Sequence, residues 1–180
     1  MKSIALFFAS LGLIVSSVGG FSLTVGNTTY SIIDGNYTWE EARVDAINRG
    51  GHLATITSHS EWESIISLLD SANIPDATLA IGGTDQNSEG NWEWITGESW
   101  DVDYWHPNEP NNSGDGGATE SFLGIWTPSI GDSTYYWHDY NNHANSDQKS
   151  YILETVPEPS TYALLLGGTV LGYAFWRRRK

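Results

Sequence analysis

Cysteine is absent from this 180-residue chain, and basic residues are scarce. Without cysteine the fold gains nothing from disulfides and must rely on its core. Five of the eight Lys and Arg residues lie at the chain ends, which leaves Arg43, Arg49 and Lys149 to balance nearly all of the 22 Asp and Glu residues. Such an acidic region repels phosphate backbones and attracts cations, so we expect no nucleic-acid partner.

Aromatic residues, in contrast, are plentiful. Eight of the nine tryptophans lie between residues 39 and 137. High acidity can indicate disorder, but so much aromatic surface predicts a folded domain, because each buried ring removes about 150–250 Å² from water. We therefore expect one domain whose tryptophans are mainly core, Trp105 included, with a sugar-stacking role for Trp105 as the alternative.

The two chain ends differ from this domain. Residues 1–20 combine Lys2, an apolar stretch and small residues, which is the layout of a secretory signal peptide; the alternative is a short helix kept in the fold. Residues 162–176 are apolar or small and precede the basic residues 177–180. This stretch is shorter than the roughly 20 residues of an untilted membrane span, so it indicates a short span or a membrane-level sorting signal.

Hydrophobic periodicity predicts two helices followed by short strands. Capping boxes open a helix over 39–49, stopped by Gly50 and Gly51, and a second over about 59–69, with Trp62, Ile65, Ile66 and Leu69 inward. Strands are expected over 28–33, 53–56, 79–81, 91–95, 121–126, 135–137 and 151–153. Together they predict an α+β domain with a long loop over 97–118 that carries the function.

Within that loop, residues 105–112 place oxygen donors around two prolines. Glu109 offers a carboxylate and Asn111 an amide oxygen, while Pro110 between them restricts the backbone and can adopt a cis bond at little cost. A loop restricted in this way can direct two oxygens at one hard cation. The alternative is a surface turn, which Asn and Pro residues commonly form.

These features together resemble the C-type lectin-like domain, over about residues 28–154. The matching segments are 39–42 (Trp-Glu-Glu-Ala), 50–53 (Gly-Gly-His-Leu), 81–83 (Ile-Gly-Gly), 91–94 (Asn-Trp-Glu-Trp), 109–111 (Glu-Pro-Asn) and 137–139 (Trp-His-Asp). Residues 156–160 (Val-Pro-Glu-Pro-Ser), the apolar stretch and the final basic cluster resemble a PEP-CTERM sorting tail, which an exosortase recognises in Gram-negative bacteria that make exopolysaccharide. The resemblance implies a signal peptide (1–20), a lectin-like domain (21–155) and a sorting tail (156–180).

The resemblance also implies a fold of two helices, short antiparallel sheets and a long calcium-binding loop. Family members usually carry two disulfides, whose positions correspond here to Ala46 with Leu153 and to Phe122 with Asn142. We expect the first pair to be a hydrophobic replacement. The second pair would leave the long loop without a tether, so that calcium must order it and its removal should expose the loop to proteases.

A calcium site follows from the same resemblance. The ligands that also contact a sugar diol correspond to Glu109, Asn111, Glu120, His138 and Asp139. In the family, Glu-Pro-Asn accompanies mannose-type sugars and Gln-Pro-Asp galactose. His138 departs from the usual Asn, and imidazole is a poor calcium ligand, so we expect weakened calcium binding that His138→Asn tightens.

A second calcium is implied by a further set of family positions. These correspond to Asp85, Glu89 and Asn112, with Glu120 shared between the two ions. The alternative for Asp85 and Glu89 is a solvated loop. Zinc held by His106, His138 and His143 is disfavoured, because their spacing matches no rigid motif and oxygen donors outnumber them.

The sequence thus predicts a calcium-dependent, mannose-type carbohydrate-binding protein of the cell surface or extracellular matrix. Its implied partners are a carbohydrate, for instance the cell's own exopolysaccharide, and an exosortase-type enzyme at the tail, with transient or lasting inner-membrane association. The alternative is a sugar-independent protein-binding or adhesion module of the same fold. We expect no enzyme and no catalytic residues, because no Ser-His-Asp or Cys-His pattern is present and calcium-bound carboxylates are poor general acids.

Overall fold

The computed structural model describes residues 20–74, 77–113, 118–127, 134–142 and 148–156. The expected signal peptide and sorting tail therefore fall almost wholly outside the described residues. Within the described ranges, no helix combines the length and the apolar character needed to cross a membrane.

Two helices form where the capping boxes predict them. Helix α1 spans Trp39–Asn48 and begins at Thr38, whose hydroxyl accepts the Glu41 N–H. Helix α2 spans His59–Ala72, begins at Ser58 and ends three residues later than expected, at Asn73 in a left-handed conformation. Leu68 is fully buried in α2, whereas Ile66 is only partly so.

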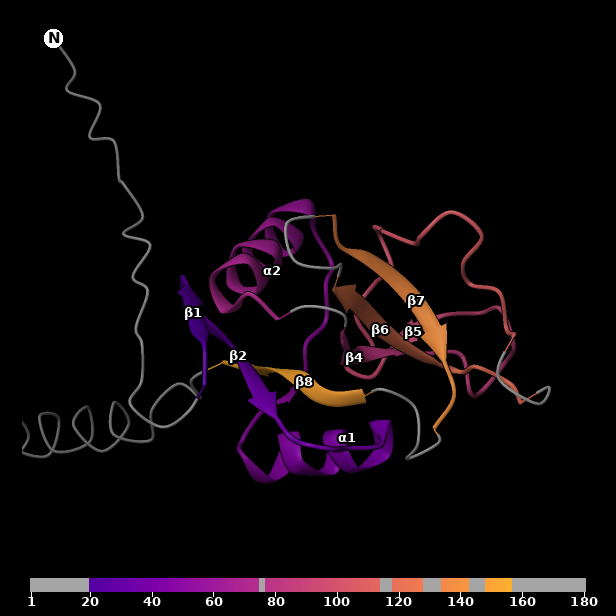
Figure 1. Cartoon of the computed structure of the whole chain (residues 1–180), viewed down its shortest axis with the longest axis horizontal. Coiled ribbons are helices and arrows are strands. Elements are labelled where there is room, and N and C mark those ends of the chain that lie inside the picture. Colours follow the sequence, from indigo (N-terminus) through magenta and orange to yellow (C-terminus); the bar gives the residue numbers. More distant parts are fainter. Residues whose placement is uncertain (1–19, 75–76, 114–117, 128–133, 143–147, 157–180) are drawn as a thin grey trace, which may run out of the picture.

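Eight strands form a single mixed sheet in the order β1-β2-β8-β4-β6-β7, with β3 beside β8 and β5 beside β4 (Figure 1). The strands are β1 Ser22–Val25, β2 Thr28–Asp34, β3 His52–Leu53, β4 Ala77–Thr84, β5 Glu93–Trp94, β6 Phe122–Thr127, β7 Tyr136–Tyr140 and β8 Gln148–Thr155. All described pairs are antiparallel except β4 with β8. The expectation of separate antiparallel sheets is corrected: β8 returns beside β4 in the same direction and joins them into one. Strand β1 was not predicted.

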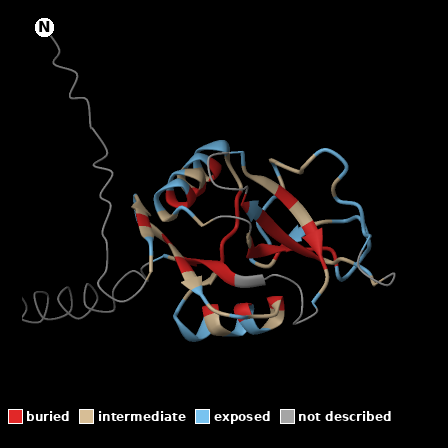
Figure 2. Cartoon of the chain, viewed as in Figure 1, coloured by how far each residue is buried: buried red, intermediate tan, exposed pale blue. Residues whose placement is uncertain are grey.

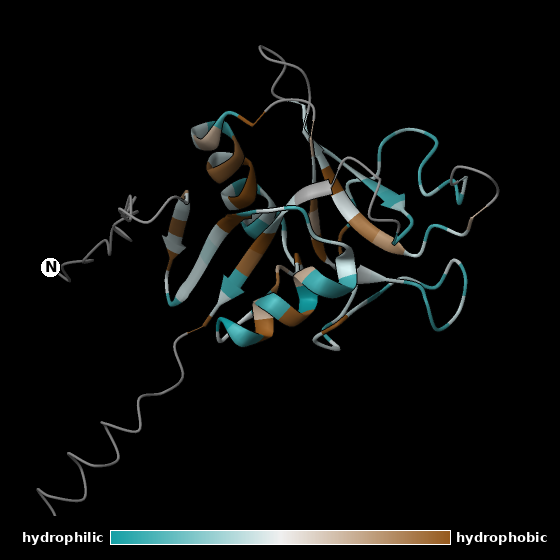
Figure 3. Ribbon diagram, turned by 60° about the horizontal axis from the view of Figure 1, so that its bottom comes forward, coloured by the Kyte–Doolittle hydropathy of each residue, from teal (hydrophilic) through white to brown (hydrophobic). Residues whose placement is uncertain are grey.

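The sheet separates two hydrophobic cores, because side chains alternate between its faces. Along β6 and β7, Leu123, Ile125 and Trp137 enter the core beneath α2. Phe122 and Tyr140 enter the second core, beneath α1, with Trp39 and Tyr151. Figure 2 shows the buried residues concentrated on the strands and the inner faces of both helices, and Figure 3 shows the same surfaces as hydrophobic.

The positions that would carry disulfides are joined by other contacts. Ala46 and Leu153 are both buried in the core beneath α1, which confirms a hydrophobic replacement. Phe122 packs its ring against Trp39 with a centroid distance of 4.7 Å, and Asn142 Oδ1 accepts the Trp39 N–H at 3.0 Å. Both members of the second pair therefore contact Trp39.

The segment between β5 and β6, residues 95–121, is the long loop. Figure 1 shows the loops that follow β4 and β5 gathered beyond β6 and β7, at the opposite side of the molecule from β1. Their colouring in Figure 3 is mostly hydrophilic. The predicted site residues lie in or beside these loops.

Candidate functional site

The long loop is tied to β7 by backbone hydrogen bonds just before the Glu-Pro-Asn segment. The Trp137 N–H donates to Tyr104 O at 2.8 Å, and the His106 N–H donates to Trp137 O at 2.9 Å. Trp105 and Trp137 thus form an isolated parallel bridge. This bridge extends the sheet by one short segment and fixes where the next residues of the loop begin.

A cluster of indole rings supports the first half of the loop. Trp100 stacks on Trp94 with centroids 4.4 Å apart, Trp92 contacts Trp105 at 4.9 Å, and Trp94 contacts Trp137 edge-on at 5.6 Å. Such pairs add about 0.5–1.5 kcal/mol each beyond their buried area. The expectation of an untethered loop is therefore corrected for this half, and Trp105 packs against the core as predicted.

Asp139 fixes the second half of the loop. Its two carboxylate oxygens accept the backbone N–H groups of Asn111 (3.0 Å) and Asn112 (2.8 Å). The Asp139 side chain is buried, and hydrogen bonds to a charged carboxylate are among the stronger ones. The sequence resemblance pointed to Asp139 as a metal ligand but not to this clamp, which no sequence signal reveals.

Glu109 is held at the turn that precedes this clamp. Its N–H donates to His106 O at 2.8 Å, and the Glu109–Pro110 peptide bond is cis. Glu109 Oε1 accepts the Asn111 Nδ2–H at 2.8 Å, whereas Glu109 Oε2 is buried and has no hydrogen-bond partner. The predicted pair Glu109 and Asn111 is thus brought together.

Glu109 also lies against Asp139 without a compensating cation. Burial of the carboxyl group is the main cause that raises the pKa of Glu109 to about 7, and contact with the Asp139 carboxylate adds to it. Two carboxylates in contact repel each other unless one is protonated or a cation lies between them.

Glu120 joins the same cluster from the end of the loop. Its N–H donates to Asn112 Oδ1 at 2.8 Å, and its Oε2 accepts the Ser113 N–H at 3.0 Å. Asn111 Oδ1 accepts the same Ser113 N–H at 2.7 Å. Ser113 therefore places the Glu120 and Asn111 oxygens near each other, a role that the sequence did not indicate.

Asp85 and Glu89 form a second carboxylate pair next to the first. Asp85 is buried, and its Oδ2 accepts the Gly90 N–H at 2.8 Å, while Oδ1 has no partner. Burial, followed by the Asp85 charge and the Asp139 charge, raises the pKa of Glu89, and a hydrogen bond from Asn112 opposes the rise. The second set of predicted residues, Asp85, Glu89 and Asn112, is thus also assembled, and it adjoins Asp139.

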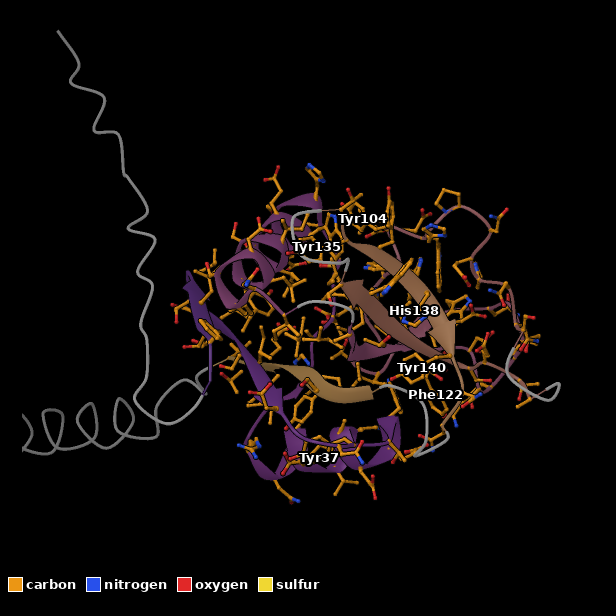
Figure 4. The ribbon with its side chains drawn as sticks, in the orientation of Figure 1. Tyr37, Tyr104, Phe122, Tyr135, His138 and Tyr140 are labelled. Carbon is orange, nitrogen blue, oxygen red and sulfur yellow. The ribbon has the colours of Figure 1, made fainter. Side chains whose placement is uncertain are left out.

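His138 is the predicted residue that the structure does not bring to this cluster. It pairs with Gly124 on β6, whereas Asp139 pairs with Leu123, so the two side chains leave β7 on opposite faces. The His138 Nε2 lies 3.0 Å from Thr78 Oγ1, on the face shared with Tyr140 (Figure 4). Burial of the ring lowers the pKa of His138 to about 4, which keeps the imidazole neutral.

The donor set fits a hard divalent cation. Among the described residues no three His, Asp or Glu groups form a preassembled metal centre. Calcium, however, also accepts amide oxygens, and Asn111 and Asn112 supply these beside the carboxylates. The buried, unpartnered oxygens of Glu109 and Asp85 are the groups that such an ion would satisfy.

The histidines do not assemble a zinc site in the part of the chain that is described. The His106 ring packs against Tyr136 and Trp126, at 5.1 and 5.8 Å between centroids. His143 lies outside the described residues. An oxygen-ligated cation remains the better fit to this loop.

Comparison with known proteins finds two family models on the chain. The model of the lectin C-type domain matches residues 35–146, and the PEP-CTERM protein-sorting motif matches residues 155–180. Human C-type lectin domain family 4 member D is 33% identical over 86 residues, which are 47% of this chain and 38% of that protein. The chain spans less than two thirds of the length of the curated relatives it matches.

Solved structures share the fold at low identity. The cow carbohydrate-recognition domain of CD23, determined in the presence of a GlcNAc2Man3 oligosaccharide, superposes with a TM-score of 0.62 at 20% identity and covers 82% of this chain and 99% of that one. A calcium-independent type II antifreeze protein superposes with a TM-score of 0.60 at 23% identity, over 81% and 96% of the two chains.

Proposed function

Because the chain belongs to the C-type lectin domain family and carries a PEP-CTERM sorting motif, we propose that it is an exported, calcium-dependent carbohydrate-binding protein with a preference for mannose-type sugars. The proposed ligands of the sugar-binding calcium are Glu109, Asn111, Glu120 and Asp139. Asp85, Glu89 and Asn112 are the proposed ligands of an auxiliary ion.

The observation that carries this proposal is the pair of buried carboxylate oxygens without partners, Glu109 Oε2 and Asp85 Oδ1. A buried, unpaired acceptor costs about 1–3 kcal/mol, and more when the group is charged. Each of these oxygens belongs to a carboxylate that lies against a second acidic side chain. A divalent cation removes both costs, because it accepts the free oxygen and offsets the repulsion.

The chain's own residues supply the selectivity for sugar. Calcium, when bound, offers coordination positions to two neighbouring hydroxyls. Each hydroxyl can also donate to a carboxylate and accept from an amide NH₂, and the Glu109–Asn111 pair presents one of each. The Asp139 clamp on two backbone N–H groups holds this pair in place without using either of its recognition groups.

The proposed life cycle follows from the chain ends. Residues 1–20 would direct export, residues 21–155 would form the binding domain, and residues 156–180 would be processed by an exosortase-type enzyme at the inner membrane of a Gram-negative bacterium. The mature protein would then act at the cell surface or in the matrix, where the cell's own exopolysaccharide is a proposed ligand. The lectin relatives support a binding role and no catalytic one.

Retention of the purified domain on mannose-agarose tests the proposal. We expect binding in millimolar calcium, elution by EGTA, and no retention of Glu109→Ala. Trp126→Phe, an exposed position outside the proposed metal cluster, serves as the matched control and should be retained on the column. Retention that persists in EGTA would contradict calcium dependence.

A second function rests on His138, which faces away from the cluster and leaves it with one donor fewer than expected. In that case the domain is a sugar-independent protein-binding or adhesion module, and the superposition on a calcium-independent antifreeze protein shows that the fold is compatible with loss of the metal. A glycan array that stays blank in calcium, together with a melting temperature unaffected by EGTA, would favour this function over the first.

A further inference from the structure

One tryptophan of the described residues is exposed to solvent. Trp126, on β6, has 46% of its surface accessible, whereas the other described tryptophans are buried or half-buried. An exposed indole exchanges a large apolar surface with water and is uncommon unless it contacts a ligand or partner. Neither the calcium cluster nor either core accounts for the exposure of Trp126.

The neighbours of Trp126 form a continuous surface. Tyr136 is its direct cross-strand partner on β7, and the His106 ring contacts both of them, at 5.8 Å from Trp126 and 5.1 Å from Tyr136. His138 follows two residues after Tyr136 on the same face of β7. Trp126, Tyr136, His106 and His138 are called the aromatic platform below.

This platform is open to ligands of limited kinds. Both helices lie away from the β6–β7 pair in Figure 1, and exposed colouring appears toward the end of β6 in Figure 2. None of the four side chains is a carboxylate, an ammonium or a guanidinium, although the chain as a whole carries a net charge of −14. Imidazole nitrogens and a phenol hydroxyl surround the indole face instead. A neutral ligand with one apolar face and a rim of hydroxyls complements this chemistry.

The platform is also continuous with the proposed calcium site. The Glu109 N–H donates to His106 O, so one tight turn joins the platform to the Glu109–Asn111 pair. Along β7, Tyr136 and Asp139 are three residues apart, which corresponds to about 10 Å of strand. A ligand larger than a single sugar ring can span this distance.

We propose that the aromatic platform is a second saccharide subsite, on which a further sugar ring of an oligosaccharide stacks against Trp126 while the terminal sugar occupies the Glu109–Asn111 site. This inference rests on the proposed function for the identity of the ligand. It extends that function, because the terminal sugar and the platform contribute separately and only the former needs calcium.

Titration calorimetry with methyl mannoside and with a mannotriose, both in calcium, tests the subsite. We expect the wild type to bind the trisaccharide about tenfold more tightly than the monosaccharide, since one aromatic contact contributes on the order of 1 kcal/mol. Trp126→Ala should bring the two affinities within about twofold of each other and leave the monosaccharide affinity unchanged. Trp126→Phe should retain part of the difference. Val44→Ala removes an exposed apolar side chain of α1 and should change neither affinity.

The indole N–H resonance of Trp126, assigned from its absence in Trp126→Phe, provides a second readout. It should shift when mannotriose is added and not when methyl mannoside is added. If the monosaccharide binds in calcium but Trp126→Ala leaves the trisaccharide preference intact, the subsite is wrong and the proposed function stands. If the monosaccharide does not bind but mannotriose still shifts the resonance, the proposed function fails and the platform stands. If neither sugar binds, both fail.

Self-association is the competing occupant of this surface. A concentration-dependent dimer in light scattering that Trp126→Ala abolishes, without any sugar-induced shift of the indole resonance, would assign the platform to a second copy of the chain and overturn the proposal.

Discussion

Asn142 Oδ1 accepts the Trp39 backbone N–H at 3.0 Å, although the two residues are 103 positions apart in the sequence. Asn142 also lies 3.5 Å from the Glu40 N–H, while Thr38 accepts the N–H of Glu41. The first N–H groups of a helix have no partner within the helix, and here a residue from the end of β7 completes the cap. One asparagine thus joins two distant segments that a disulfide bridges elsewhere in the family.

Replacement of Asn142 tests this cap. We expect Asn142→Ala to lower the free energy of unfolding by about 1 kcal/mol, which is typical for loss of a helix-capping side chain. Asn142→Asp keeps the acceptor and adds a negative charge at a helix N-terminus, so it should be neutral or stabilising. Urea unfolding at pH 7 measures both. Equal destabilisation by the two variants would show that the hydrogen bond contributes little.

The helices and most strands could be predicted from the sequence, because local signals define them. Thr38 with Glu41 and Ser58 with Glu61 form the capping boxes at the expected positions. Strand β1 was missed because its four residues form a strand only by pairing with β2. The parallel pairing of β4 with β8 was missed for a related reason: it joins segments about 70 residues apart, and no local pattern encodes it.

The site was predictable only in part. Family resemblance identified Glu109, Asn111 and Asp139, which the structure brings together. It also assigned His138, whose neighbour Asp139 is a correctly placed donor. Adjacent strand residues point to opposite faces, and His138 finds a partner in Thr78 of β4, which the sequence alone does not place nearby. The indole cluster that supports the loop depends on packing between distant residues and was equally inaccessible.

Substitution of His138 separates the two interpretations of its role. The resemblance implies that His138→Asn tightens calcium binding, whereas the position of the ring on the opposite face of β7 implies no change in calcium affinity. We expect calorimetry to give the same calcium affinity for the variant and the wild type. The free energy of unfolding should fall instead, because the buried contact with Thr78 is lost. A tighter calcium affinity would restore His138 to the ligand set.

Removal of calcium should expose only the second half of the long loop to proteolysis. Residues 92–105 are held by indole packing that needs no metal, while Glu120 is held by two contacts within the loop. We expect the Glu-specific protease Glu-C to cut after Glu120 in EGTA and much more slowly in calcium. Cleavage after Glu98, which lies within the supported half, should occur at the same rate in both conditions and serves as the internal control.

The pKa of Glu109 predicts how the calcium-free protein responds to pH. In the folded state this pKa lies near 7 instead of its ordinary value of 4.5, so the folded state binds more protons than the unfolded state between these values. The stability of the calcium-free protein should therefore fall as pH rises from 4.5 to 7. Melting temperatures in EGTA across this range measure the effect, and Glu109→Gln should lack the Glu109 contribution to it. Saturating calcium should reverse the trend, since the ion favours the ionised carboxylate.

Exchange of the two recognition side chains tests the sugar preference. The double variant Glu109→Gln, Asn111→Asp exchanges the carboxylate and the amide and keeps one of each, so calcium should still bind. The direction of the hydrogen bonds offered to the two sugar hydroxyls is then reversed, and the resemblance implies a change from mannose-type to galactose-type ligands. We expect competition assays to show weaker inhibition by methyl mannoside and stronger inhibition by methyl galactoside. The single variant Asn111→Asp, which places two carboxylates at the site, should favour neither sugar and controls for charge. Unchanged preference in the double variant would mean that sugar selection lies outside the Glu109–Asn111 pair.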